Sequence, residues 1–261
     1  MKTGPRQRRL EILSFLGRGS VSVRALARRL GVSEVTIRRD LAALEREGKL
    51  LRVYGGAFPN ERVAYEFSFR EKESRNRAAK ESIGRAAAGL VEPGFAVFLD
   101  TGTTALAVAR ALRAAPPAVI VTTNLCVASE YVGQRDVKVL VPGGEVGAIS
   151  PDVCGDWTIE TLSGVNVDVA FLGCDAVDPT DGFYCADTRS AAVSRLMLSR
   201  SRRAYLIADS SKFGRRSMFR IAPLRRLTGV VTDNALPPRY RAALRRLGVA
   251  VIAENGGRKE K

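Results

Sequence analysis

Three threonines and a glycine stand where an apolar run gives way to a helical pattern in AVFLDTGTTALAVARAL. The apolar run predicts a strand that ends at Asp100, and Gly102 permits a tight turn before the helix. The N–H groups of a first helical turn, joined by the hydroxyls of Thr101, Thr103 and Thr104, can hold a phosphate group. The alternative is that the threonines only cap the helix. Because the chain contains neither GxxxxGK[ST] nor GxGxxG, this segment does not identify a nucleotide.

Polar residues also follow several other predicted strands. Each of them alone is more often a turn former or a helix cap. The carboxyl ends of parallel strands, however, meet at the edge of the sheet where α/β proteins bind their ligands, so together they predict one pocket. Carboxylate and amide oxygens suit sugar hydroxyls, and a lysine suits a phosphate or carboxylate. Besides the loop from Asp100 to Thr104, we expect this pocket to include Thr123, Asn124, Gly143, Gly144, Asp175, Asp178 and Lys212.

The composition excludes a large part of enzyme chemistry. None of the 261 residues is a histidine, which excludes Ser-His and Cys-His nucleophile pairs and every metal site that needs an imidazole. The four cysteines, at positions 126, 154, 174 and 185, form no CxxC pair. We therefore expect buried, reduced thiols, no metal site and no cofactor.

Basic residues are concentrated at the amino end. The whole chain carries 42 Lys and Arg against 27 Asp and Glu, a net charge of +15, and residues 1–57 hold 13 of the basic and 5 of the acidic residues. This predicts a small domain that binds a polyanion, joined to a larger and more balanced domain. A general preference for arginine is the alternative. The N-terminus does not resemble a signal peptide and no apolar run approaches ~18 residues, so we expect a cytoplasmic protein with no membrane partner.

The first domain has the pattern of a helix-turn-helix. Helical periodicity predicts helices over residues 6–17, 23–30 and 33–47. In the third, Ile37, Leu41 and Leu44 recur on one face, and Ser33 stands in front as an N-cap. The link formed by Gly31 and Val32 is short enough to force a sharp turn between the second and third helices.

The outward face of the third helix can reach DNA. Arg38 and Arg39 lie near its start, and an arginine fork matches guanine or a phosphate. The alternative is a solvated face in which they pair with Asp40 or Glu34. The run KLLRVYGGA predicts two short strands around a tight turn, a wing that lies along the phosphate backbone. We expect DNA contacts from Ser33, Thr36, Arg38, Arg39, Lys49, Arg52 and Tyr54.

The rest of the chain alternates strand-like and helical segments. After a connection over residues 58–74, we expect a helix over 75–90 and further helices over 103–113, 125–133, 188–200 and 239–247. Strands are expected over 95–100, 119–123, 137–141, 169–173, 205–208, 230–232 and 249–252. This order predicts a mainly parallel sheet covered by helices. The predicted domains are therefore a winged helix-turn-helix over 1–57, a linker over 58–74 and an α/β domain over 75–261.

Both predicted domains resemble one family. The stretch RRLEILSFLGRGSVSVRALARRLGVSEVTIRRDLAALEREGKLLRVYGGA resembles the winged helix-turn-helix signature of the DeoR family of bacterial sugar-metabolism repressors. That family usually has a histidine in the HGGA that closes the wing, where this chain has Tyr54. VFLDTGTT, VTTN, VPGG, AFLGCDAVD and ADSSKFG resemble its effector domain, so the resemblance covers roughly residues 6–233. It implies an effector domain similar in fold to ribose-5-phosphate isomerase and a phosphorylated sugar that changes operator affinity.

The isomerase resemblance makes catalysis the main alternative function. Moving a proton between carbons needs a positioned carboxylate base. In ADTRSAAVSRLM, Ser190 stands where related regulators commonly carry glutamate, so we expect no enzyme activity. A nucleic-acid packaging protein is a third possibility, but it would not need the α/β domain. The expected function is a transcriptional regulator, a repressor of a sugar or carbohydrate catabolic operon, whose partners are operator DNA, a phosphorylated sugar and further copies of itself in a dimer or tetramer.

Overall fold

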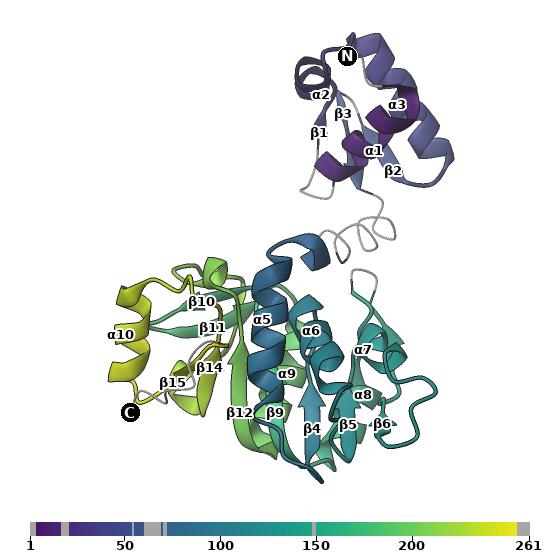
Figure 1. Ribbon diagram of the computed structural model, residues 1–261. Helices are drawn as coiled ribbons and strands as arrows, with labels where there is room; N and C mark the ends of the chain where they lie inside the picture. The colour runs from purple at the N-terminus through teal and green to yellow at the C-terminus, as the bar shows by residue number, and fades with distance from the viewer. Residues whose placement is uncertain are drawn as a thin grey trace. The chain divides into compact units, whose positions relative to one another are not determined.

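The computed structural model describes residues 4–16, 21–53, 55–59, 69, 72–147 and 150–254. The chain forms two compact units, one made of residues 1–72 with 148–150 and the other of residues 73–147 with 151–261 (Figure 1). The change from one unit to the other at residues 72 and 73 lies close to the start predicted for the α/β domain. We call the first unit the head and the second unit the body.

The head is a three-helix unit with a small sheet. Its helices are α1 (Pro5–Leu16), α2 (Val23–Leu30) and α3 (Glu34–Arg46), and its strands are β1 (Val21–Ser22), β2 (Leu50–Val53) and β3 (Gly56–Pro59). The sheet is antiparallel in the order β1-β3-β2. The three predicted helices and the hairpin are confirmed. Strand β1 was not predicted because it has only two residues, and β3 takes residues 58 and 59 from the segment predicted as a linker.

Local sequence signals define the turn between α2 and α3. The hydroxyl of Ser33 accepts a hydrogen bond from the N–H of Thr36 at 3.2 Å and so caps α3. Gly31 ends α2 in the left-handed conformation at φ 63°, which a glycine adopts without a steric penalty. Ile37, Leu41 and Leu44 are almost completely buried in the core of the head. The apolar face of α3 therefore points inward, as its spacing predicted.

The body is built on a seven-stranded sheet in which every neighbouring pair is parallel. The strands are β4 (Ala96–Leu99), β5 (Val119–Thr122), β6 (Lys138–Leu140), β9 (Val167–Leu172), β12 (Ser201–Ile207), β14 (Gly229–Val231) and β15 (Ala250–Ile252). Their order is β15-β14-β12-β9-β4-β5-β6. The predicted parallel sheet is confirmed, and all seven predicted strands are present with ends that differ by a few residues.

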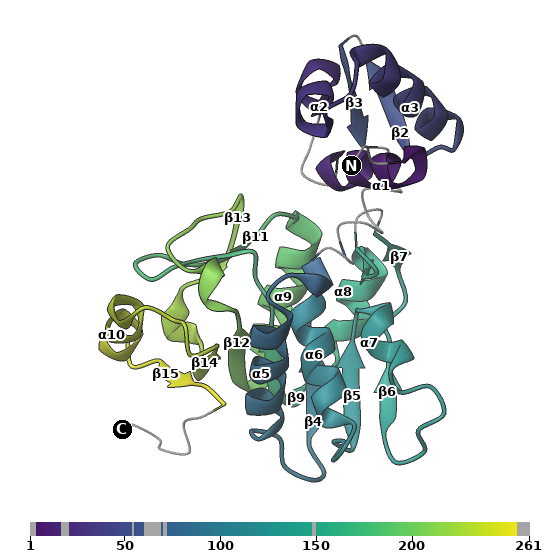
Figure 2. The same ribbon diagram turned by 45° about the horizontal axis from the view of Figure 1, so that its top comes forward.

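Helices cover both faces of this sheet. They are α5 (Arg77–Ala88), α6 (Thr103–Leu112), α7 (Leu125–Ser129), α8 (Asp156–Ser163), α9 (Thr188–Arg200) and α10 (Pro238–Arg246). Figures 1 and 2 show α5 and α6 side by side on one face, while α8 and α9 pack together behind the strands. The helix predicted over residues 125–133 ends early at Ser129, and α8 was not predicted.

The strand order reverses between β4 and β9. From β4 the chain proceeds through β5 to β6, whereas from β9 it proceeds in the opposite direction through β12 and β14 to β15. In open α/β sheets, a ligand binds outside the carboxyl ends of the strands at such a reversal. Asp100 directly follows β4 and Gly173 directly follows β9, so both lie at this point.

Two smaller sheets were not predicted. Strands β7 (Glu145–Val146) and β8 (Val153–Cys154) form an antiparallel pair, and β10 (Ala176–Asp178), β11 (Gly182–Cys185) and β13 (Phe219–Ala222) form a separate antiparallel sheet. These strands have two to four residues each. Runs this short carry too little alternation to be recognised from periodicity.

Candidate functional site

The start of α3 presents an exposed polar surface. Ser33, Arg38 and Arg39 are exposed and Thr36 is half-buried, while the opposite side of the helix lies in the core. Ser33 is partly engaged, because its hydroxyl caps the helix and lies 2.9 Å from the hydroxyl of Thr36. Recognition helices of helix-turn-helix domains present an exposed polar surface of this kind on their first turns.

The two adjacent arginines of α3 differ in their contacts. Arg38 pairs with Glu34 at 3.0 Å across one helical turn, and both side chains are well exposed, at 60 % and 44 %. An exposed pair of this kind contributes about 0.3–0.5 kcal/mol, so a phosphate or a base can replace Glu34 at little cost. Arg39 makes no side-chain hydrogen bond or ion pair with the residues that the structure describes.

Asp40 has a structural role instead. Its carboxylate is buried and binds the guanidinium groups of Arg8 and Arg9, the latter at 3.2 Å. The alternative in which Asp40 pairs with Arg38 or Arg39 is therefore wrong, because Asp40 faces α1 on the inner side of α3. A buried pair of this kind is strongly destabilised when one partner is removed. Asp40 thus holds α3 against α1.

Ion pairs hold the predicted wing to the end of α3. Arg52 donates its backbone N–H to Glu45 at 3.0 Å and its guanidinium lies 3.5 Å from the same carboxylate. Lys49 pairs with Glu47 at 2.8 Å. Both cationic side chains stay more than 40 % exposed, so they remain accessible to a phosphate backbone. Tyr54, which was also predicted to contact DNA, lies outside the described residues.

An exposed valine on α3 was missed by the sequence analysis. Val35 is 57 % exposed in the first turn of the helix, between the capping serine and the arginines. Apolar side chains in this position of a reading helix can contact the methyl group of thymine. The sequence did contain an indication that Val35 is exposed, because its position does not fall on the helix face formed by the buried residues of α3.

In the body, Asp100 is buried at the strand reversal. It is 1 % exposed, and its Oδ2 accepts hydrogen bonds from the N–H of Gly173 and the hydroxyl of Ser194, both at 3.0 Å. Burial raises the pKa of Asp100 to about 6, although the N–H groups of Thr101 and Gly173 and the hydroxyl of Ser194 act in the opposite direction. By hydrogen-bond geometry, Oδ1 has no partner among the described residues.

The threonines of the first loop do not cap the helix that follows. The N-cap of α6 is Gly102, with a φ of 92° and no side-chain capping bond. The first intrahelical hydrogen bond runs from Leu106 to the carbonyl of Gly102, so N–H groups of the preceding turn lack an intrahelical acceptor. The N-cap is therefore a glycine and not one of the threonines. Thr101 and Thr104 are half-buried and Thr103 is buried at this helix end.

Two neighbouring residues at the end of β5 add further unfilled polar atoms. Asn124 caps α7, since its Oδ1 accepts from the N–H groups of Cys126 at 2.8 Å and Val127 at 3.2 Å. Its Nδ2 and the hydroxyl of Thr123 are buried without a hydrogen-bond partner in the described chain. Together with Asp100 Oδ1, they make three buried polar atoms that follow two adjacent strands and have no hydrogen-bond partner among the described residues. Buried polar groups of this kind call for a ligand or ordered water.

The second glycine of the pair after β6 serves packing. A Cβ on Gly144 would lie 2.3 Å from the Thr158 hydroxyl and 2.5 Å from the Cys154 carbonyl oxygen. The carbonyl of Gly143 accepts a hydrogen bond from the same Thr158 hydroxyl at 2.8 Å. Gly144 thus allows β7, β8 and α8 to approach one another closely, whereas a Cβ on Gly143 would meet nothing within 4 Å.

The two aspartates near β10 have different surroundings. Asp178 binds Arg216 at 2.6 Å and both the N–H and hydroxyl of Thr180, and these contacts lower its pKa to about 2. Asp178 is the last residue of β10, and its carboxylate is engaged by these contacts where the chain turns toward β11, while its place in the pocket stays a prediction. Asp175 accepts a hydrogen bond from the N–H of Ala186 at 2.9 Å.

The end of β9 places the Cys174 thiol within electrostatic range of Lys212 and three aspartates. Burial raises the pKa of the Cys174 thiol, while the charge of Lys212 lowers it and the charges of Asp175, Asp209 and Asp100 raise it. Cys174 thus lies within electrostatic range of all four groups. Lys212 is half-buried at the end of a 3₁₀ turn, and its ammonium has no ion-pair partner in the part of the chain that the structure describes. It can therefore receive an anion.

Ser190 lies in the first turn of α9, one turn before the Ser194 that binds Asp100. Its N–H and its hydroxyl both donate to Asp187 at 3.1 Å. Asp187 is the N-cap of this helix, and its side chain is 49 % exposed. Its carboxylate is thus already used to hold the start of α9.

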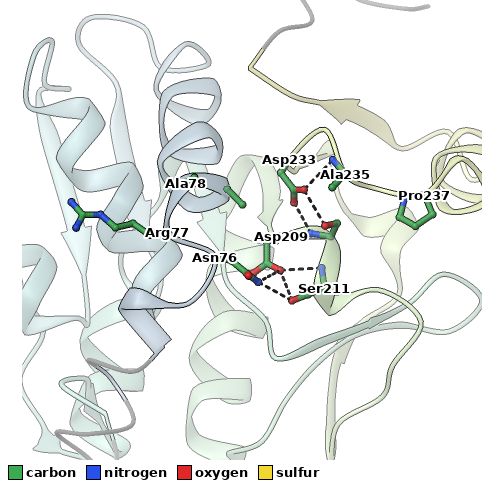
Figure 3. Close-up of a pocket in the computed structure, with 10 residues that line it drawn as sticks. Asn76, Arg77, Ala78, Asp209, Ser211, Asp233, Ala235 and Pro237 are labelled. Atoms are coloured by element: carbon green, nitrogen blue, oxygen red, sulfur yellow. Dashed lines mark hydrogen bonds between the residues drawn. The ribbon is translucent and has the colours of Figure 1, made fainter. Parts of the chain in front are cut away.

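A cavity of about 460 Å³ lies between the start of α5 and the ends of β12 and β14 (Figure 3). It brings together residues that the sequence analysis did not select. Asn76 donates its Nδ2 to Asp209 Oδ1 at 3.1 Å and to the Ser211 hydroxyl at 3.3 Å. Asp233 accepts from the N–H and the hydroxyl of Ser210. The segments ADSSKFG and VVTDN contained both aspartates, but nothing in them indicated a shared cavity with Asn76.

The described part of the chain bears on disulfides, metal-binding groups and membrane-spanning helices. Its four cysteines form no disulfide; Cys154 and Cys185 are buried and the other two are half-buried. No group of three or more cysteine, aspartate or glutamate side chains among these residues could hold a metal ion. None of the described helices is both long and apolar enough to cross a membrane.

Comparison with known families gives two matches that together span most of the chain. Residues 8–63 match the DeoR-like helix-turn-helix domain, and residues 75–234 match the DeoR C terminal sensor domain. A putative aga operon transcriptional repressor of Escherichia coli O157:H7 is 36 % identical over 96 % of this chain and 94 % of that protein. The glycerol-3-phosphate regulon repressor of Escherichia coli strain K12 is 33 % identical over 84 % and 86 %. The L-fucose operon activator of Haemophilus influenzae is 30 % identical over 84 % and 88 %.

Solved structures give weaker resemblances. Ribose 5-phosphate isomerase A from Neisseria gonorrhoeae matches with a TM-score of 0.38 and 19 % identity over 52 % of this chain and 53 % of that chain. The translation initiation factor eIF2B delta from Chaetomium thermophilum matches with a TM-score of 0.44 and 18 % identity over 66 % and 61 %. Both scores lie below 0.5, and no functional conclusion is based on them.

Proposed function

The chain belongs to the DeoR family of transcriptional regulators, and from this premise we propose that it represses a sugar or carbohydrate catabolic operon and leaves its operator when a phosphorylated sugar binds. Its relatives are named as regulators and not as enzymes, which sets the isomerase alternative aside. The activator among them makes activation the second candidate for its output. Such a regulator works where its operator DNA lies, in the cytoplasm.

The head reads DNA through the first turns of α3. Arg39 and Val35 are exposed there, and Arg38 has only a weak surface partner to give up. We assign base contacts to these three side chains. Phosphate contacts are assigned to Ser33, Thr36, Lys49 and Arg52, and the sequence adds Tyr54 as a further candidate.

The body holds the effector at the strand reversal. The observation that supports this most strongly is Asp100, a fully buried carboxylate with an unfilled oxygen at the position where parallel sheets bind ligands. The N-terminus of α6 with Thr101, Thr103 and Thr104 receives the phosphate, aided by Lys212. Sugar hydroxyls then fill Asp100 Oδ1 and the unfilled groups of Thr123 and Asn124, with Asp175 nearby.

Regulation needs a ligand with different affinities for two arrangements of the protein. Ordinary coupling of this kind amounts to about 1–3 kcal/mol. In a symmetric dimer or tetramer, two heads contact repeated half-sites, and the ligand favours an arrangement in which their spacing no longer matches the DNA.

The DNA assignment is tested by replacing both Arg38 and Arg39 with alanine. Losing two arginine contacts at about 1–3 kcal/mol each should weaken operator binding by roughly 30-fold or more, measured by gel shift at fixed salt. The matched control replaces Arg245 and Arg246 at the end of α10, which removes the same charge from the body. Equal affinities of the two double variants would contradict the assignment.

The phosphate assignment is tested by the double variant Thr103→Val and Thr104→Val. Valine keeps the shape of threonine and removes the hydroxyl, so the variant should bind its operator normally but fail to respond to the effector. The effector is found beforehand as the sugar phosphate that raises the thermal midpoint of the full chain. Thr161→Val, on the exposed side of α8, is the control. Release of the double variant by the same ligand concentration would show that the phosphate binds elsewhere.

A further inference from the structure

The cavity beside α5 has a defined polar lining. Asp209 and Asp233 follow β12 and β14 and are only 2 % and 8 % exposed, although both line an open space. Figure 3 shows the carboxylate of Asp209 beside the amide of Asn76 at the start of α5, with Asp233 and Ala78 further along the same space. A volume of about 460 Å³ is within the usual range of small-molecule sites.

Asn76 leaves the start of α5 uncapped. It is the one non-glycine residue with a positive φ in the described chain, at 50°, and it occupies the N-cap position without a side-chain capping bond. Its amide turns away to bind Asp209 and Ser211. The backbone N–H groups of Ala78 and Ala79, which line the cavity, therefore have no acceptor among the described residues.

Asp209 supplies an unfilled acceptor to the same space. Its Oδ1 accepts hydrogen bonds from Asn76 and from the N–H and hydroxyl of Ser211. Its Oδ2 accepts none from the described residues. Both oxygens of Asp233, by contrast, already accept bonds from Ser210 and Ala235. The cavity thus presents both free N–H donors and a free carboxylate oxygen.

This combination selects among ligand classes. A phosphate or other anion would meet two buried carboxylates. The guanidinium of Arg77 pairs with Glu81 at 2.7 Å and points away from the cavity (Figure 3). The guanidinium of Arg241 is engaged by the backbone carbonyls of Leu236 and Asn234, at 3.2 and 3.3 Å. A metal ion would find most carboxylate oxygens already occupied by N–H and O–H donors. A hydroxyl group donates and accepts at the same time, so it can bind Asp209 Oδ2 and a helix N–H together.

We propose that the cavity between Asn76, Asp209 and Asp233 is a binding site for a hydroxyl-rich carbon chain, a sugar or a polyol. The site stands on its own observations and does not require the phosphate loop of the proposed function. The hydroxyl-rich chain belongs either to the sugar part of the phosphorylated effector or to a separate, unphosphorylated ligand. Both sources share the chemistry that Asp209 and the start of α5 recognise.

The test fills the cavity without removing a hydrogen bond. Ala78→Leu places a larger side chain in the space, and because Ala78 is exposed and leucine is a good helix former, α5 should still fold. Ala242→Leu, on the exposed face of α10, is the matched control. The full chain and both variants are titrated by calorimetry with pentoses, hexoses and hexitols and with the phosphate esters of the same compounds.

We expect at least one of these compounds to bind the wild-type chain and Ala242→Leu, and to bind Ala78→Leu at least tenfold more weakly. A second variant, Asp209→Asn, replaces the unfilled acceptor with a donor and should weaken the same compound at least tenfold. If only phosphate esters show this pattern, the cavity holds the sugar part of the effector, and the hydroxyl contacts assigned above to Asp100, Thr123 and Asn124 are wrong. If the unphosphorylated compounds show it as well, the ligand is separate.

The proposal is overturned if no compound binds, or if every compound that binds the wild-type chain binds Ala78→Leu with the same affinity. A phosphate ester that binds all variants equally and still releases the operator would leave the proposed function intact while refuting this site. A compound whose binding depends on the cavity but which leaves operator affinity unchanged would support this site and count against the proposed function. The two proposals therefore fail separately.

Discussion

Replacing Asp100 with asparagine should change how the stability of the body depends on pH. Asp100 is completely buried, and its ordinary pKa of 3.8 is raised to about 6, chiefly because burial disfavours the charged form. The folded state therefore holds the Asp100 proton more tightly than the unfolded chain does. Asparagine has a similar shape and does not ionise, so the difference between the two proteins reports the ionisation of this one group.

The magnitude follows from the difference between the two pKa values. A shift of about 2.2 pH units corresponds to about 3 kcal/mol. Below pH ~3.8 Asp100 is protonated in both the folded and the unfolded state, and its ionisation costs nothing. As the pH rises from there to above 6, the cost develops fully, so the wild-type chain loses about 3 kcal/mol of stability relative to Asp100→Asn.

The assay is urea unfolding of both proteins at several pH values between 4 and 8. The other titrating groups are common to both chains, and any fixed change in packing or hydrogen bonding adds a constant. The measured quantity is thus the change in the stability difference with pH. Asp100→Asn should gain on the wild type between pH 4 and 7, and it should lose its response to the effector, because the free oxygen is part of the proposed site.

A stability difference that stays constant from pH 4 to 8 would refute this reasoning, since it would mean that Asp100 ionises equally well in the folded and unfolded states. A difference that moves in the opposite direction would mean that its hydrogen bonds from Gly173 and Ser194 outweigh its burial. An unchanged effector response in a folded variant would remove Asp100 from the ligand site.

Three further predictions concern packing and recognition. Asp40→Ala leaves two arginines without their carboxylate and should destabilise the head by about 3 kcal/mol, seen as faster amide exchange in α1 and α3; exchange as slow as in the wild type would contradict the role of this buried pair. Gly84→Ala puts a Cβ 2.6 Å from the Ala107 carbonyl oxygen and should cost about 1–3 kcal/mol in thermal unfolding, whereas Gly89→Ala in the same region meets nothing closer than 3.6 Å and should cost little. Val35→Ala should leave folding unchanged and reduce the preference for thymine at one operator position in a binding-site selection; an unaltered preference would show that Val35 does not contact a base.

The head could be predicted from the sequence because its structure depends on neighbouring residues. The spacing of Ile37, Leu41 and Leu44 defined the buried face of α3, and Ser33 and Gly31 defined the turn before it. Caps, periodicity and short turns are local signals, and the structure confirms them. The ion pairs between different helices of the head do not depend on neighbouring residues in the sequence. The pairing of Asp40 with Arg8 and Arg9 spans about thirty residues of chain, so spacing on α3 alone left two possible partners open.

The body was predicted only in part for the same reason. Its parallel strands were recognisable as apolar runs, and several strand ends were selected correctly as polar. Strand order decided which of them come together. Asp100 meets Gly173 because β4 and β9 are neighbours in the sheet, although 73 residues separate them. Asp178 was selected on equal grounds, but the structure binds it to Arg216 in a separate sheet.

The sequence by itself determined the three helices of the head, the strands of the parallel sheet, the division into a basic head and an α/β body, and the family, since these depend on residue types and on spacing over a few residues. Only the tertiary structure decided that Asn76 faces Asp209 across 133 residues, that Asp100 is buried with an unfilled oxygen, and that a cavity lies between α5 and the ends of β12 and β14. These features arise where distant segments pack against one another. The burial and hydrogen bonding of a residue depend on every residue near it in space, whereas a sequence pattern gives information only about residues close to it along the chain.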